Sequence, residues 1–227
     1  MKPLLTLAET STPGGSRLTL HEHDGDILLK LNGRQLMSSA ATRSETRLAE
    51  IACKFHPPIA RPRILIGGLG LGYTLRRVLE LANPAAIVHV AEYIPEVVTW
   101  NRELLGPESK AALEDPRVTV LVADVFKVIK HSDTPLDRYD AILLDVDNGP
   151  VAMVASGNSR LYNRHGIASI ARALRPRGRA AIWSADQDDP FSARLVQEGF
   201  IVTPFEAKPH DRAKRAAHRI YLAELRA

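Results

Sequence analysis

The feature of this chain that most constrains its fold is a glycine-rich loop placed between an apolar run and a helical pattern. The apolar run is Ile64-Leu65-Ile66, and the amphipathic helical pattern begins at Thr74. The loop between them contains Gly67, Gly68, Gly70 and Gly72. Because glycine has no Cβ, a ligand can lie directly against the backbone of such a loop, and the helix behind it offers unpaired N–H groups. This order predicts the start of an α/β domain that binds a nucleotide or nucleoside.

The spacing of the glycines argues against two common phosphate-binding motifs. A dinucleotide fingerprint requires G-x-G-x-x-G, whereas Gly68-x-Gly70-x-Gly72 is followed here by Tyr73. A P-loop requires a Lys-Ser/Thr pair, and this loop has no basic residue to meet a pyrophosphate. The G-x-G-x-G pattern resembles the first motif of S-adenosylmethionine-dependent transferases. A tight turn that needs glycine for steric reasons alone is the alternative.

Strand and helix patterns alternate along most of the chain. Residues 17–39 predict a small antiparallel β meander with hairpin turns at Asp24-Gly25 and Asn32-Gly33. A helix is expected from about residue 44 to 55, where Thr42 and Glu45 fit a capping box. Strand–helix units follow, with strands expected at 63–67, 87–91, 118–122, 139–144 and 179–184. Two last strands, 200–205 and 220–225, have no helix between them and should pair antiparallel.

This alternation predicts an α/β fold with a mostly parallel seven-stranded sheet. The layout is that of the Rossmann-like fold of S-adenosylmethionine-dependent methyltransferases, with an antiparallel last strand and a preceding β meander. We expect an N-terminal meander domain over residues 1–41 and a Rossmann-like transferase domain over residues 42–227.

Composition places the chain among ordinary globular proteins. It has 227 residues, of which 45% are hydrophobic and 25% charged, enough for one substantial domain and a small appendage. Its single cysteine, Cys53, excludes a disulfide framework and a cysteine-rich zinc site, and we expect no metal. No apolar run is long enough to span a bilayer, and the first ten residues do not resemble a signal peptide. We therefore expect a cytoplasmic protein with no membrane partner.

The basic charge of the chain is local. The formal net charge is +4, and five basic residues against one acidic residue between positions 207 and 219 account for all of it. A nucleic-acid footprint normally covers a face or a stripe of the surface. We therefore expect no nucleic-acid partner, and an RNA methyltransferase that uses residues 207–219 is kept as an alternative.

Acidic residues follow the strands that neighbour the glycine loop. In open α/β sheets, ligands bind at the carboxyl ends of the strands. Glu92 ends the second strand of the predicted sheet, where a carboxylate can accept both hydroxyls of a ribose. Asp124 follows the third strand, where it could accept from an adenine amino group or cap the next helix. Asp145, Asp147 and Asn148 follow the fourth strand. Together they favour a nucleoside site that contacts hydroxyl groups and no phosphate.

Several of these segments resemble the spermidine synthases. Gly67-Gly-Leu-Gly-Leu-Gly resembles the family's Gly-Gly-Gly-Asp-Gly-Gly loop, and Glu92-Tyr-Ile-Pro-Glu-Val-Val resembles its Glu-Ile-Asp-x-x-Val-Val. Asp124 and the run Tyr139–Asp145 also match family positions, and Leu31-Asn32-Gly33 is similar to the family's Leu-Asp-Gly hairpin. The resemblance covers about residues 17–185. It implies a role in polyamine biosynthesis, in which an aminopropyl group moves from decarboxylated S-adenosylmethionine to a small-molecule amine.

The chain departs from the family pattern at the amine side of the site. Gly70 stands where the family's loop has an aspartate that holds the donor's amine, and Asp-Ser-Ser-Asp-Pro is replaced by Asp145-Val-Asp-Asn-Gly-Pro. Arg43-Ser44-Glu45 stands for the family's Tyr-x-Glu and supplies only the glutamate.

Roles follow for the remaining candidates. We expect Asp145 to orient the attacking amine and accept its proton, and Asp147 or Asn148 to hold the acceptor's other polar atoms. Tyr73 could cover the sulfonium with its ring face or be a packed core residue. Two further alternatives are a methyltransferase that uses S-adenosylmethionine itself and a nucleoside-binding homologue without turnover. A homodimer remains open.

Overall fold

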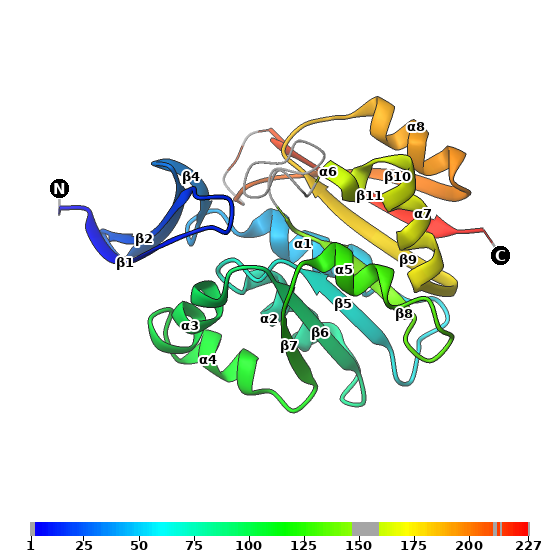
Figure 1. The fold of residues 1–227 in the computed structure, drawn as a ribbon, viewed down its shortest axis with the longest axis horizontal. Coiled ribbons are helices and arrows are strands. Elements are labelled where there is room, and N and C mark those ends of the chain that lie inside the picture. Colours follow the sequence, from blue (N-terminus) through cyan, green and yellow to red (C-terminus); the bar gives the residue numbers. More distant parts are fainter. Residues whose placement is uncertain (1–2, 147–158, 211–212, 214, 227) are drawn as a thin grey trace.

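The computed structural model describes residues 3–146, 159–210, 213 and 215–226. The chain begins with a small antiparallel sheet that lies to one side of the main body (Figure 1). Its strands are β1 Leu5–Ser11, β2 Arg17–His23, β3 Asp26–Leu31 and β4 Arg34–Ser38. Both predicted hairpin turns are confirmed: Asp24, Gly25, Asn32 and Gly33 all have positive φ, as a type I′ turn requires.

The first strand, β1, was not predicted from the sequence. It pairs with β2 as the outer strand of the sheet, and its register shifts between Thr6 and Ala8. This irregularity interrupts the alternation of apolar and polar residues on which a strand prediction depends.

The main sheet has the predicted mixed topology. Its strand order is β10-β11-β9-β8-β5-β6-β7, in which β11 runs antiparallel to both neighbours and the other pairs are parallel. The strands are β5 Arg63–Gly67, β6 Ile87–Glu92, β7 Val118–Val122, β8 Tyr139–Leu144, β9 Leu174–Ser184, β10 Phe200–Ala207 and β11 His218–Leu225. The carboxyl ends of β5, β6, β7, β8 and β9 therefore meet at one edge, and the start of β11 reaches the same edge.

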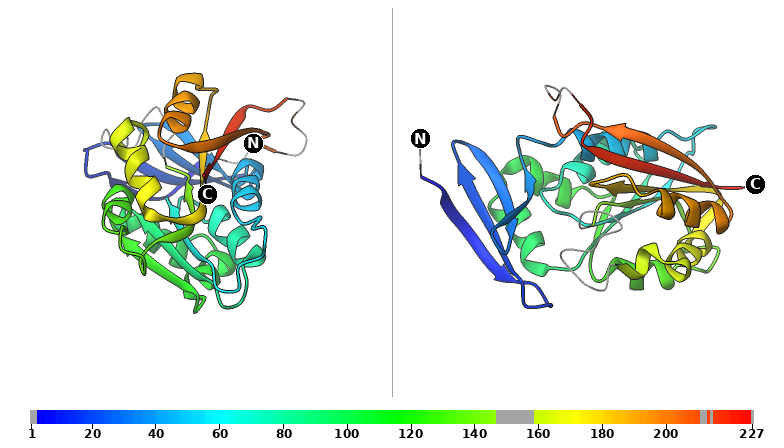
Figure 2. Two further views of the ribbon diagram at one scale, coloured as in Figure 1. Left: turned by 90° about the vertical axis from the view of Figure 1, so that its right-hand side faces the viewer. Right: turned by 90° about the horizontal axis from the view of Figure 1, so that it is seen from above.

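Helices cover both faces of this sheet, with α1 on one side and α5 and α7 on the other (Figure 2). The first group is α1 Arg43–Ala52, α2 Tyr73–Leu81, α3 Pro95–Glu103 and α4 Pro107–Glu114. The second group is α5 Val125–Lys130, α6 Ser159–Tyr162, α7 Arg164–Ala173 and α8 Asp189–Gln197. The short helix α4 was not predicted, and the single helix expected over 161–174 is divided into α6 and α7.

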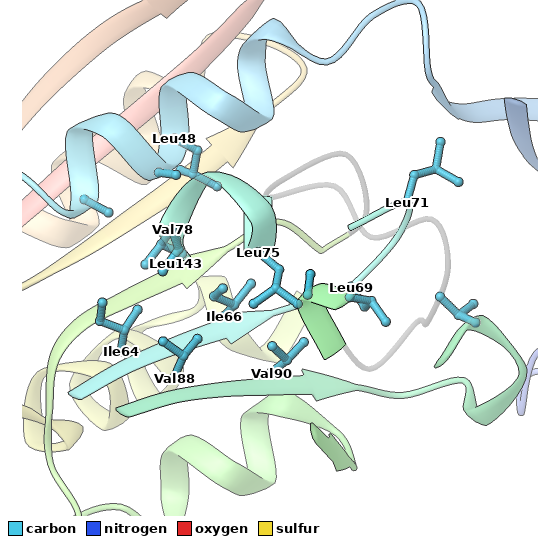
Figure 3. Close-up of a cluster of buried hydrophobic side chains, with 14 of the residues drawn as sticks. Leu48, Ile64, Ile66, Leu69, Leu71, Leu75, Val78, Val88, Val90 and Leu143 are labelled. Atoms are coloured by element: carbon cyan, nitrogen blue, oxygen red, sulfur yellow. The ribbon is translucent and has the colours of Figure 1, made fainter. Parts of the chain in front are cut away.

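The larger hydrophobic core lies between the main sheet and the first group of helices. Figure 3 shows side chains from β5, β6 and β8 meeting Leu48 of α1 and Leu75 of α2. Leu69 and Leu71 of the glycine loop are buried in the same cluster, together with four leucines of the small sheet, Leu18, Leu20, Leu29 and Leu31. The small sheet is therefore continuous with the core and helps to fix the glycine loop. No helix of the described residues is long and apolar enough to cross a membrane.

Candidate functional site

The glycine loop adopts a backbone conformation that side chains disfavour. Gly68, Gly70 and Gly72 have φ of +89°, +52° and +81°, in the region that glycine enters without a steric penalty. A Cβ on Gly68 would overlap the backbone oxygen of Asp145. A Cβ on Gly67 would lie 2.8 Å from Val125 Cγ2. The loop therefore lies directly against the end of β8, and glycine is needed there for close approach as well as for conformation.

Gly70 faces the small N-terminal sheet. A Cβ at this position would overlap the sulfur of Met37 on β4. An aspartate, which the sequence comparison with the spermidine synthases would place here, could enter only if the Met37 side chain moved.

Glu92 holds the glycine loop in place. Its Oε2 accepts a hydrogen bond from the Leu69 N–H and its Oε1 accepts one from the Ile94 N–H, both at 2.9 Å. The side chain is buried, and burial raises its pKa against the opposing effect of these backbone donors. Each carboxylate oxygen has a second lone pair, so contact with a ribose remains compatible with this arrangement and remains a prediction.

Asp124 caps the helix that follows β7, which confirms one of the two readings of this residue. Its Oδ1 accepts from the Phe126 N–H at 2.9 Å. Its Oδ2 pairs with Arg160 of α6, whose guanidinium carbon lies 4.8 Å from the centre of the Phe126 ring. A contact between Asp124 and an adenine stays a prediction, and it would take place beside this ion pair.

Asp145 is half-buried just past the end of β8 and accepts a hydrogen bond from the Thr74 hydroxyl at 2.8 Å. Burial raises its pKa to about 6, against the opposing effect of the Thr74 hydrogen bond. The carboxyl group expected to act as a base thus lies beside the helix that follows the glycine loop.

A second carboxyl group, from Glu45 on α1, lies within electrostatic reach of Asp145. Burial and the charge of Asp145 raise the pKa of Glu45 to about 7, although a hydrogen bond from the Ser44 hydroxyl (2.6 Å) opposes the rise. The predicted capping box is wrong: Thr42 makes no side-chain cap hydrogen bond, and Glu45 is buried instead. Because two close carboxylates do not both ionise readily, the pair retains a proton near neutral pH.

Of the other predicted substrate-binding residues, the structure describes only Tyr73. The Tyr73 ring lies under the guanidinium of Arg76, 4.3 Å from its carbon. It lines a polar groove of about 710 Å³ between α1, α2 and α4. Its contact with a sulfonium stays a prediction. Asp147 and Asn148 lie outside the described residues.

The comparisons with known proteins agree with this architecture. The family model described as the spermine/spermidine synthase domain matches residues 44–191, which is more than half of the chain. The chain belongs to the spermine/spermidine synthase family. The family match includes the glycine loop, Glu45 and the acidic strand ends described above.

Curated members of the family are moderately similar to this chain. The polyamine aminopropyltransferase of Corynebacterium efficiens is 30% identical over 171 residues, which are 74% of this chain and 31% of the relative. That of Pyrobaculum calidifontis is 32% identical over 127 residues, 54% of this chain and 43% of the relative. The chain spans about a third of the length of the first curated relatives that it matches.

Solved structures of the family share the fold. The spermidine synthase of Thermotoga maritima superposes with a TM-score of 0.76 at 17% identity, covering 97% of this chain and 72% of the other. A spermidine synthase in complex with the transition-state analogue AdoDATO superposes with a TM-score of 0.75 at 18% identity, with the same coverage.

Sequence reasoning missed part of the candidate site in this chain. Glu45 was recognised as a counterpart of the family glutamate but was assigned to a helix cap. Thr74 was taken only as the start of a helix, and Asn101, whose amide donates to the Gly70 carbonyl at 2.8 Å, was not considered. A usable signal existed for Asn101, because an amide on the buried face of a predicted helix needs a polar partner. Among the described residues, no group of three side chains could hold a metal ion.

Proposed function

We propose that this chain transfers an aminopropyl group from decarboxylated S-adenosylmethionine to a small amine. The observation that carries the proposal is the carboxyl pair of buried Glu45 and half-buried Asp145 beside the glycine loop of a spermine/spermidine synthase fold. Neither carboxyl group has a cationic partner among the described residues, and such carboxyl groups provide a site for an ammonium group. The names of the curated relatives, polyamine aminopropyltransferases, support the same reaction.

The sheet edge divides into a donor half and an acceptor half. Glycines at the end of β5, Glu92 at the end of β6 and Asp124 after β7 would hold the nucleoside of the donor. Asp145 at the end of β8 and Glu45 on α1 would hold the acceptor. The sulfonium would then lie near the Gly68–Asp145 contact, where the two halves meet.

The reaction is an in-line displacement at carbon. The acceptor enters as an ammonium and gives one proton to the carboxyl pair, so that its nitrogen has a free electron pair. That nitrogen attacks the carbon attached to the sulfonium, the carbon–sulfur bond breaks, and its electrons leave on a neutral thioether. The product nitrogen keeps its remaining protons as a secondary ammonium, and the carboxyl pair releases the proton that it took to solvent before the next turnover. A carboxyl group with a pKa of about 6 or 7 suits proton exchange near neutral pH, and holding the reactants in line can supply several kcal/mol, roughly 7–11 in the best cases.

One observation favours methyl transfer from S-adenosylmethionine as a second candidate. Gly70 is packed against Met37 and provides no carboxylate for the free amine of a decarboxylated donor. Methyl transfer would not need that carboxylate, because S-adenosylmethionine carries its own.

The deciding experiment is thermal denaturation with each donor, followed by product analysis. A higher melting temperature with decarboxylated S-adenosylmethionine, together with an aminopropylated product, would support the proposal. A melting temperature that rises with S-adenosylmethionine but not with its decarboxylated form would refute aminopropyl transfer and favour methyl transfer. Nucleoside binding without any product would identify a silent homologue, and RNA binding that falls steeply with salt would favour the RNA alternative.

Two variants test the role of Asp145. Asp145→Asn should abolish product formation while nucleoside binding persists, because the donor half is untouched. Asp137→Asn is the matched control, since Asp137 lies half-exposed just before the start of β8, at the opposite end of this strand. Normal turnover in Asp145→Asn would refute the proposed role of Asp145 as the base.

A further inference from the structure

Two aromatic rings extend the acceptor half of the edge beyond Asp145. Strands β8 and β9 pair with Leu144 opposite Ile182, so the next residues, Asp145 and Trp183, stand side by side. Trp183 packs against the core on the α1 side of the sheet, the side from which Glu45 and Thr74 approach Asp145. Neighbouring strands are about 5 Å apart, so this ring lies within reach of a small acceptor bound at the carboxyl pair.

The second ring belongs to His218 at the start of β11. Trp183 pairs with Ile220 across the β9–β11 ladder, and His218 precedes Ile220 by two residues, so it lies on the same face. The ring centres of Trp183 and His218 are 4.8 Å apart. Asp145 just past the end of β8, Trp183 on β9 and His218 on β11 therefore follow one another across the sheet, on the face covered by α1.

Both rings carry a buried polar atom with which no described residue forms a hydrogen bond. Trp183 Nε1 and His218 Nδ1 are shielded from solvent and have no hydrogen-bond partner among the described residues. An unsatisfied buried donor or acceptor destabilises the folded protein, and native structures keep few of them. Two such atoms on touching rings, next to a candidate substrate site, indicate a ligand group that pairs with both.

The chemistry of the two atoms defines that ligand group. An indole N–H can only donate, so it fits an oxygen and repels an ammonium. Burial lowers the pKa of His218, against a weaker opposing effect of Asp186, and its imidazole is therefore neutral near pH 7. A neutral imidazole can either donate or accept at Nδ1. A hydroxyl group, which both accepts and donates, satisfies the two rings together.

The charge of the carboxyl pair leads to the same substrate class. Because Glu45 and Asp145 share a proton near neutral pH, the pair carries close to one negative charge. One charge balances one ammonium group. A second ammonium at Trp183 and His218 would find no charge on either ring, and among the described residues only Asp186, which acts on the pKa of His218 more weakly than burial does, could balance it.

We propose that Trp183 and His218 form the far end of the acceptor site and select an amino alcohol over a diamine. The inference rests on the proposed function, since it assumes that the acceptor amine binds at Glu45 and Asp145. The amine would lie at the carboxyl pair, and a hydroxyl group roughly three to five carbons away would lie between the two ring nitrogens.

The test is calorimetric titration of the protein saturated with 5′-methylthioadenosine. The two probes are 4-aminobutan-1-ol and 1,4-diaminobutane, which differ only in the far group. The wild type should bind the amino alcohol at least about tenfold more tightly, as expected for one hydrogen bond to a group otherwise left unpaired. Trp183→Phe keeps an aromatic ring but loses the N–H. It should remove this preference by weakening the binding of the amino alcohol and leaving the binding of the diamine unchanged.

The controls separate this inference from the proposed function. Trp100→Phe, in the core on α3, should leave the preference intact. If Trp183→Phe does not fold, His218→Gln should reduce the same preference. The inference would be overturned if the wild type bound the diamine more tightly than the amino alcohol, or if Trp183→Phe weakened the binding of both probes equally. Either result would leave the proposed function standing. Absence of 5′-methylthioadenosine binding would instead refute the proposed function, and this inference with it.

Discussion

Replacing Glu45 with glutamine should make the folded protein more stable than the wild type at alkaline pH. Burial and the neighbouring Asp145 raise the pKa of Glu45 from its ordinary value of 4.5 to about 7. Between these two values the folded state keeps a proton that the unfolded chain has lost. The free energy of unfolding of the wild type therefore falls as the pH rises through this window.

The size of the effect follows from the pKa difference. A difference of one pKa unit corresponds to about 1.4 kcal/mol, so the rise from 4.5 to about 7 corresponds to about 3 kcal/mol. Glutamine does not titrate and can still accept from the Ser44 hydroxyl. Glu45→Gln should therefore gain up to about 3 kcal/mol over the wild type above pH 8, and the difference should vanish below pH 4.5.

Urea unfolding at several pH values between 4 and 9 measures this difference. Glu50→Gln, on the same helix, is a control of opposite sign. Burial acts to raise the pKa of Glu50, but hydrogen bonding with Arg47 and the charges of nearby arginines outweigh it and lower the pKa. Glu50→Gln should therefore have a lower free energy of unfolding than the wild type at neutral pH. This difference should shrink as the pH falls through 4.5. A Glu45→Gln effect that is independent of pH, or destabilising at pH 8, would refute the shared-proton pair.

Three further changes test the donor half. Gly68→Ala should lower the free energy of unfolding more than Gly106→Ala does, because both glycines have φ near +88° but only Gly68 lacks space for a Cβ. The positive φ alone costs about 1–2 kcal/mol at either position. Equal losses in urea unfolding would contradict the close packing around Gly68. Glu92→Gln places an amide N–H₂ against backbone donors and should weaken 5′-methylthioadenosine binding about tenfold or more by calorimetry; unchanged affinity would contradict its role in holding the loop. Arg160→Ala frees Asp124 and should tighten nucleoside binding by up to about fivefold, whereas weaker binding would show that Arg160 itself contacts the ligand.

Most of the fold could be predicted because it depends on local patterns. The alternation of strand and helix patterns gives the parallel sheet, and the lack of a helical pattern in the sequence between the last two predicted strands gives the antiparallel end. The two elements that were missed carry weak local signals. β1 has an interrupted alternation, and α4 is a short helix with few apolar residues.

The candidate site was only partly predictable, since its two halves depend on different kinds of contact. Glu92, Asp124 and Asp145 could be found because each stands at a strand end, and the topology brings strand ends together. The partners of these residues come from distant segments: Glu45 precedes Asp145 by a hundred positions, and Arg160 reaches Asp124 from α6. No local pattern specifies such contacts, and the local pattern around Glu45 suggested a different role.

The buried acids of this protein differ in whether the fold compensates for their burial. Glu92 accepts two backbone N–H groups and fixes the glycine loop, so its burial has a structural explanation. Glu45 and Asp145 each have one hydroxyl donor among the described side chains, and the charge of Asp145 raises the cost of ionising Glu45. If stability of the folded protein were the only requirement, replacing either carboxyl group with an amide would be favourable. The carboxyl pair is therefore best explained by a bound cation, and this argument assigns the acceptor amine to Glu45 and Asp145 and not to the glycine loop.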